Sequence, residues 1–166
     1  ASLEEGATDE LDGYWGRFIG DLLEANPEAT VARLGVAEET LAGGGGFPRV
    51  WPDEERAEIR VLGPVTRERD GVPALPDLGD RGQNTNGHSV CLRIDVGGAR
   101  LLMTGDLNKA SMDWLMDAYG DRIAAFNCDV TKACHHGSAD ISYRFLERVN
   151  AAATVKALDE RDTGTI

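Results

Sequence analysis

The chain of 166 residues is long enough for one domain with a sizeable core, and its 42% hydrophobic and 28% charged content is typical of globular proteins. A net charge of −12 argues against loose, sequence-independent binding to nucleic acid, which requires clustered lysine and arginine. No apolar run approaches the roughly 18 residues of a membrane-spanning helix, so we expect no membrane segment and a cytoplasmic location.

The three cysteines, Cys91, Cys128 and Cys134, are an odd number and show no Cys-x-x-Cys spacing. Each lies in an apolar, strand-like run, which favours buried free thiols in a reducing compartment. The first five residues also lack the basic and apolar regions of a secretion signal.

Residues 1–46 are predicted to form a helical N-terminal part. Apolar residues in the segment 11–23 recur at the i, i+3, i+4, i+7 spacing of a helix, and Asn26-Pro27 is expected to end it. Residues 28–41 indicate a second helical stretch. The glycines at 43–46 predict a flexible loop and not a phosphate-binding loop, because no Gly-Lys-Ser/Thr follows them.

Residues 47–166 are predicted to form a mixed-sheet part of the same domain. Residues 47–52 indicate an irregular loop, whereas residues 57–62 alternate apolar and charged side chains, like a strand with one solvent-facing side. Residues 66–87 are polar and rich in glycine and proline, which predicts a long irregular connection. Residues 89–104 then predict a hairpin of two strands joined by Gly97-Gly98.

The remainder of the chain alternates helices and strands. A helix capped by Asp106 or Asn108 is expected to stop at Gly120. A strand at 128–134, a short helix at 142–149 and the start of a strand at 151–155 are predicted to follow. This order predicts the α/β class, with helices packed on a mixed sheet in one domain.

Side chains that ligate metals follow two of these strands. Asp106 comes after the strand that ends at Thr104, and His135 and His136 come after the strand at 128–134. Adjacent parallel strands joined by a helix place their ends side by side, so the carboxylate and an imidazole can meet. Such donors suit a divalent metal, for which we expect Zn²⁺, with Mn²⁺ as the alternative. Taken singly, Asp106 is also an ordinary helix cap and the histidines an ordinary surface pair.

Residues from about 59 to 155 resemble the C-terminal half of a metallo-β-lactamase-fold domain. The likeness is greatest to the hydrolase domain of bacterial DNA-internalisation competence proteins, which serve DNA uptake. The matching segments are Val61-Leu62-Gly63-Pro64, Asn86-Gly87-His88-Ser89-Val90, Leu102-Met103-Thr104-Gly105-Asp106-Leu107, Asp129-Val130-Thr131-Lys132 and His135-His136-Gly137-Ser138. The resemblance implies a partial metallo-β-lactamase-like fold and a metal-dependent hydrolase that acts on a phosphodiester or another small molecule.

The resemblance also implies residue roles. Asp106 would bridge two metal ions and, with His135, be catalytic, while a metal-bound water supplies the attacking hydroxide. His135 is favoured as the metal ligand and His136 as its hydrogen-bonding neighbour, with the reverse assignment left open. The residues expected to hydrogen-bond the ligands are Thr104, Ser138, Asn86 and His88.

The chain departs from the family in one major respect. The His-x-His-x-Asp-His motif is absent, and the whole chain has three histidines, so the sequence resembles a truncated domain that lacks its first half. Two or three donors are too few for a tight catalytic site, so we expect weak metal binding and little or no activity from this chain alone. Two other interpretations remain: a non-catalytic binding or scaffold module with a degenerate metal site, and a hydrolase of another ester class, such as a lactone or thioester.

Overall fold

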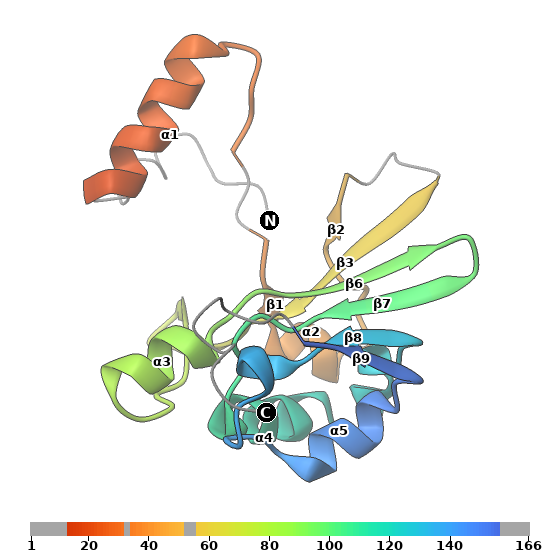
Figure 1. The fold of residues 1–166 in the computed structure, drawn as a ribbon. Coiled ribbons are helices and arrows are strands. Elements are labelled where there is room, and N and C mark those ends of the chain that lie inside the picture. The colour runs from red at the N-terminus through yellow and green to blue at the C-terminus, as the bar shows by residue number, and fades with distance from the viewer. Residues whose placement is uncertain (1–12, 32–33, 52–55, 157–166) are drawn as a thin grey trace, which may run out of the picture. The chain divides into compact units, whose positions relative to one another are not determined.

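The computed structural model describes residues 13–31, 34–51 and 56–156 of the chain. Two compact units, residues 1–34 and 35–166, are considered separately. The described part of the first unit contains helix α1 (Gly13–Ala25), shown in red in Figure 1. It confirms the predicted N-terminal helix, whose expected first residues lie outside the described residues.

The second unit is built on a six-stranded sheet with the strand order β2-β3-β6-β7-β8-β9 (Figure 1). The pairs β7–β8 and β8–β9 are parallel and the other pairs are antiparallel, which confirms the predicted mixed sheet. The strands are β2 (Arg49–Val50), β3 (Ala57–Gly63), β6 (Cys91–Val96), β7 (Ala99–Met103), β8 (Val130–Lys132) and β9 (Ala153–Val155).

The predicted hairpin is formed by β6 and β7. Its turn residues Gly97 and Gly98 have φ angles of +54° and +86°. Two successive positive φ angles make a turn whose twist matches the twist of the strands, and glycine adopts them without steric cost. The hairpin places β7 beside β8 in the middle of the sheet.

The prediction of an irregular connection at residues 66–87 was wrong. This segment holds most of a hairpin, β4 (Val65–Arg69) and β5 (Val72–Ala74), followed by helix α3 (Arg81–Gly87). The overlooked signal is Asp70-Gly71, a two-residue hairpin turn in which both residues have positive φ. These strands form a second sheet, in the order β1-β4-β5, with β1 (Val36–Ala37).

Two further predictions also need correction. The helix expected over residues 28–41 is reduced to α2 (Glu38–Ala42), because Val36 is buried and pairs with Val65 in the small sheet. The segment 47–52 is not wholly irregular, since β2 lies within it and pairs with β3.

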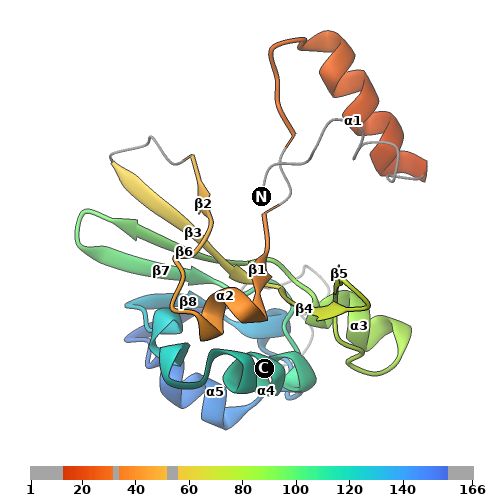
Figure 2. The same cartoon turned by 180° about the vertical axis from the view of Figure 1, so that it is seen from behind.

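Helices α4 (Lys109–Tyr119) and α5 (Tyr143–Val149) lie on one face of the six-stranded sheet, as Figures 1 and 2 show from opposite sides. A 3₁₀ segment, η1 (Gly120–Phe126), continues from α4 and leads towards β8. The hydrophobic core lies between these helices and the sheet. Its largest fully buried side chains include Leu62, Leu102, Leu107, Met112, Phe126 and Phe145.

The other face of the six-stranded sheet carries a row of apolar side chains. Successive strands bring one residue each into register, and cross-strand partners point to the same face. The row, called here the open apolar row, is Val50, Ile59, Ile94, Leu101, Val130 and Ala153. None of the six is fully buried, whereas Leu102, next to Leu101 on β7, is completely buried against the helices.

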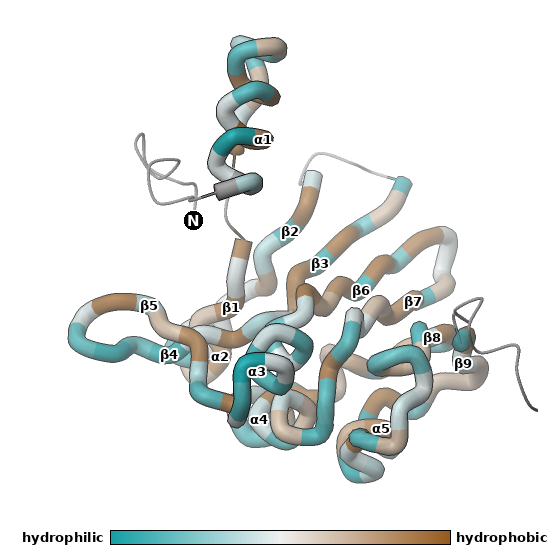
Figure 3. The backbone as a smooth tube through the Cα atoms, turned by 60° about the vertical axis from the view of Figure 1, so that its left-hand side comes forward, coloured by the Kyte–Doolittle hydropathy of each residue, from teal (hydrophilic) through white to brown (hydrophobic). Residues whose placement is uncertain are grey.

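The charged residues of β3 and β6 therefore point to the face that bears the helices. Arg60 pairs with Arg93, and Arg93 pairs with the buried Leu102. The strand predicted at residues 57–62 is confirmed as β3, with its charged side chains on the face that bears the helices. The alternation of apolar and charged residues is visible as brown and teal bands along β3 and β6 in Figure 3.

The structure confirms the α/β class, with mixed sheets and helices packed on them. Among the described residues, no helix has the length and apolar composition needed to cross a membrane.

Candidate functional site

The ends of β7 and β8 lie side by side, as the sequence predicted. The two strands are parallel, with Leu101 opposite Val130 and Leu102 opposite Thr131. Helix α4 and η1 form the crossover between them. Asp106 therefore follows one strand and the two histidines follow its neighbour at the same edge of the sheet.

Asp106 is available for contacts because another residue caps α4. The Ser111 N–H donates to Asn108 Oδ1 at 3.0 Å, and the Asn108 N–H donates to Ser111 Oγ at 3.0 Å. The Asp106 N–H donates instead to Ser89 Oγ at 2.9 Å. Gly105 makes this turn feasible: its φ is +56°, and a Cβ added there would lie 2.6 Å from the Ser89 Cβ. The capping alternative for Asp106 is thus excluded.

The histidines form a strained turn. His135 has φ +46° and ψ +47°, His136 has φ +56° and ψ +23°, and Gly137 has φ +80°. The left-handed region costs a residue with a Cβ about 1–2 kcal/mol, and such strain is found mainly at functional sites. The turn is closed by the Ser138 N–H, which donates to the His135 carbonyl at 2.9 Å.

His136 and His135 occupy different surroundings. His136 Nε2 lies 3.3 Å from Asp106 Oδ1, and its side chain is 53% exposed. His135 Nε2 instead lies 3.4 Å from Asn86 Nδ2 of α3, and among the described residues its buried Nδ1 has no hydrogen-bond partner. The structure thus brings His136 to the carboxylate and turns His135 towards α3.

Lys132, at the end of β8, is the third charged group at Asp106. Its Nζ lies 3.4 Å from Asp106 Oδ1 and donates to the Gly105 carbonyl at 2.8 Å and the Ala133 carbonyl at 3.2 Å. The Lys132 side chain is only 19% exposed. Lys132 lies in one of the segments that match the metallo-β-lactamase-fold domain, but no role was predicted for it. Its position at the end of a strand, like that of Asp106, is the signal that could have identified it.

The remaining predicted residues support the loops or lie elsewhere. Thr104 is completely buried, and its hydroxyl donates to the Lys132 carbonyl at 3.2 Å, which ties the two strand ends together. Ser138 Oγ accepts the Asp140 N–H at 3.2 Å within its own loop. His88 Nε2 lies 2.9 Å from the Pro76 carbonyl. Ser89, which was not predicted, is the residue that holds the Asp106 backbone.

The cysteines are the buried free thiols that the sequence predicted. Burial raises the pKa of all three thiols, that of Cys128 to about 11. They are therefore protonated at neutral pH and do not add thiolate donors to the Asp106 site.

The geometry of Asp106 and His136 matches one edge of a metal site but not a whole one. Two ligands of a tetrahedral zinc ion, with bonds of roughly 2.0–2.1 Å, lie about 3.3 Å apart. A catalytic site needs three protein ligands, and no cluster of three His, Cys, Asp or Glu side chains that could hold a metal occurs within the described ranges. The Lys132 ammonium group also competes for the Asp106 carboxylate. The described residues alone therefore do not fit a catalytic metal ion.

Similarity to known proteins covers only part of the chain. No protein-family model matches the chain, and no solved structure matches it significantly. It is 30% identical over 99 residues to uncharacterized proteins of Mycobacterium tuberculosis and Mycobacterium bovis. The match covers 59% of this chain and 42% of each relative, so the chain spans less than half the length of the curated relatives it matches.

Proposed function

We propose that the chain contributes part of a metal-dependent hydrolase site of the metallo-β-lactamase type, directed at a phosphodiester. Asp106 and His136 are two of its donors, and no third His, Cys, Asp or Glu donor joins them among the described residues. The observation that carries this proposal is the 3.3 Å separation of Asp106 Oδ1 and His136 Nε2 at the ends of adjacent parallel strands. By itself the chain binds metal weakly and hydrolyses little or nothing.

Two other features support the proposal. His135 and His136 both have the left-handed conformation, which glycine would adopt without strain. Histidines at these positions are expected where the chemistry of the side chain matters more than stability. The open apolar row on the sheet is the kind of face that a second layer covers, as in a layered αβ/βα fold.

A second candidate function rests on Lys132. Its ammonium group, held by two carbonyls and Asp106, already neutralises the carboxylate that a metal would need. This arrangement favours a non-catalytic binding module in which a lysine replaces the metal.

Calorimetric titration of the purified chain with Zn²⁺ and with Mn²⁺ separates the two functions. For the hydrolase, Asp106→Asn and His136→Ala abolish the weak binding, His135→Ala retains it, and Lys132→Met strengthens it by removing the competing cation. Metal binding that is absent, or equal in the unsubstituted chain and in Asp106→Asn, contradicts the hydrolase and favours the binding module. Release of nitrophenol from a phosphodiester, compared with a lactone and a thioester, identifies the ester class once the missing donors are supplied.

A further inference from the structure

A hollow lined by arginines lies at the end of β7 opposite Asp106. It has a volume of about 570 Å³ and is bounded by β3, the β6–β7 hairpin and the loop after η1. Four arginines and three acidic residues line it, in a chain whose net charge is −12. The hollow is thus a local region of positive charge on an acidic protein.

Several arginines of the hollow share one carboxylate. Arg93 Nε and Arg100 Nε each donate to Asp95 at 3.0 Å, and Arg60 Nη1 lies 4.0 Å from the same side chain. Glu58 likewise serves both Arg60 and Arg49. Asp129, the third acidic residue, uses its Oδ2 to accept the Arg100 backbone N–H at 2.7 Å. Three arginines of the hollow, Arg60, Arg93 and Arg100, therefore share the single carboxylate of Asp95.

Arg93 is the most buried of these three arginines. Its side chain is 9% exposed, and besides Asp95 it donates to the Ala125 carbonyl at 3.1 Å. Burial, the largest cause, lowers the pKa of the Arg93 guanidinium; Asp95 opposes this shift, and Arg60 and Arg100 add to it. A buried guanidinium group whose neighbours are mostly cationic gains from an additional anion.

Arg93 and Arg100 each use a single guanidinium N–H group on the shared carboxylate of Asp95. Both donate to Asp95 through Nε and to a backbone carbonyl through Nη1, so among the described residues neither guanidinium group forms two parallel bonds to one carboxylate. Guanidinium groups with N–H groups to spare bind phosphate oxygens with charge-assisted hydrogen bonds. We propose that the hollow between Arg60, Arg93 and Arg100 binds a phosphate group, as free phosphate or as part of a small phosphorylated ligand.

The test is calorimetric titration of the whole chain with inorganic phosphate at constant ionic strength, with acetate as the monovalent comparison. Saturable phosphate binding is expected, weakened about tenfold or more in Arg93→Gln and in Arg60→Gln, because each loses charge-assisted hydrogen bonds. Arg60→Gln keeps the test valid if Arg93→Gln fails to fold, because the Arg60 side chain is 29% exposed. Asp95→Asn is expected to strengthen binding, since it removes the competing carboxylate.

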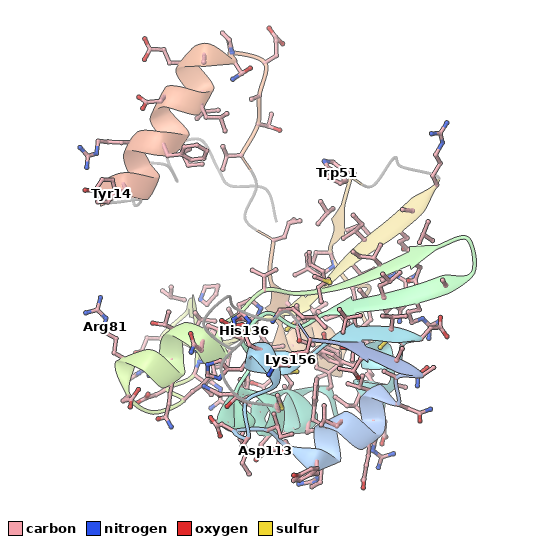
Figure 4. The ribbon with its side chains drawn as sticks, viewed as in Figure 1. Tyr14, Trp51, Arg81, Asp113, His136 and Lys156 are labelled. Atoms are coloured by element: carbon pink, nitrogen blue, oxygen red, sulfur yellow. The ribbon has the colours of Figure 1, made fainter. Side chains whose placement is uncertain are left out.

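The matched control is Arg81→Gln, because Arg81 is exposed and projects outward from α3 (Figure 4). It should bind phosphate like the unsubstituted chain. Three results would overturn the proposal: no saturable binding, equal binding of phosphate and acetate, or equal weakening by Arg81→Gln and Arg60→Gln. Asp106→Asn should leave phosphate binding unchanged, so the outcome is independent of the proposed hydrolase site.

Discussion

Replacing His136 by glycine and by alanine measures the strain in the histidine turn. Both substitutions remove the imidazole and its contact with Asp106, so the difference between them reports on the backbone alone. At φ +56° the left-handed conformation disfavours alanine over glycine by about 1–2 kcal/mol. The greater conformational freedom of glycine in the unfolded chain favours unfolding and so reduces this difference by roughly 0.4–1 kcal/mol. We therefore expect His136→Gly to be more stable than His136→Ala by about 0.5–1 kcal/mol.

Urea unfolding followed by circular dichroism gives this difference directly, and thermal unfolding should show a corresponding gap of about 1–4 °C. The matched control is the same pair of substitutions at Asp117, an exposed residue within α4. There the order should reverse, with alanine more stable than glycine by about 1 kcal/mol, because the backbone is helical. If alanine equals or exceeds glycine in stability at position 136, the turn is not strained and the functional argument from strain fails.

The remaining two predictions concern pH and the open apolar row. Hydrogen bonds from Lys109 and from Ser142 hold the pKa of Asp113 below its ordinary value, so the folded state binds its proton less readily than the unfolded state does. Asp113 contributes about 0.3–1 kcal/mol to the free energy of unfolding, as expected for a partly exposed carboxylate; this contribution is present above its ordinary pKa of about 3.9 and is lost as the pH falls through the lower folded value. Asp113→Asn should therefore reduce the loss of stability between pH 6 and pH 3 in urea titrations. An unchanged pH dependence would contradict this. Ile94→Glu should lower the fluorescence of a bound hydrophobic dye and the light scattering of the chain. It should reduce the free energy of unfolding by about 1–3 kcal/mol, since Ile94 is partly buried. A loss above about 4 kcal/mol would show that the face is covered.

The part of the fold that the sequence predicted correctly is the part fixed by local signals. Gly97-Gly98 between two apolar strands specified a hairpin, and Asn108 followed by a periodic apolar stripe specified α4. These signals depend on backbone sterics and on nearest neighbours, which the sequence contains directly. The side-by-side ends of β7 and β8 followed from the rule that parallel strands need a crossover.

The errors arose where distant contacts decide the structure. Val36 was assigned to a helix, but it pairs with Val65, which is distant in the sequence. Which histidine ligates a metal stays a prediction, because spacing alone does not show that the left-handed turn directs the His136 ring to Asp106 and the His135 ring to Asn86. Lys132 became visible as a neighbour of Asp106 only once both strand ends were in place.

Helix α3 is joined to both halves of the candidate site by amide side chains. Asn108 Nδ2 at the start of α4 donates to the Gln83 carbonyl at 2.8 Å, and Asn86 reaches His135 from the same helix. A ligand or a second polypeptide that displaces this seven-residue helix therefore acts on the carboxylate loop and the imidazole turn in one movement. A molecule that binds α3 and touches neither Asp106 nor His136 can therefore change the distance between these two side chains by moving the helix.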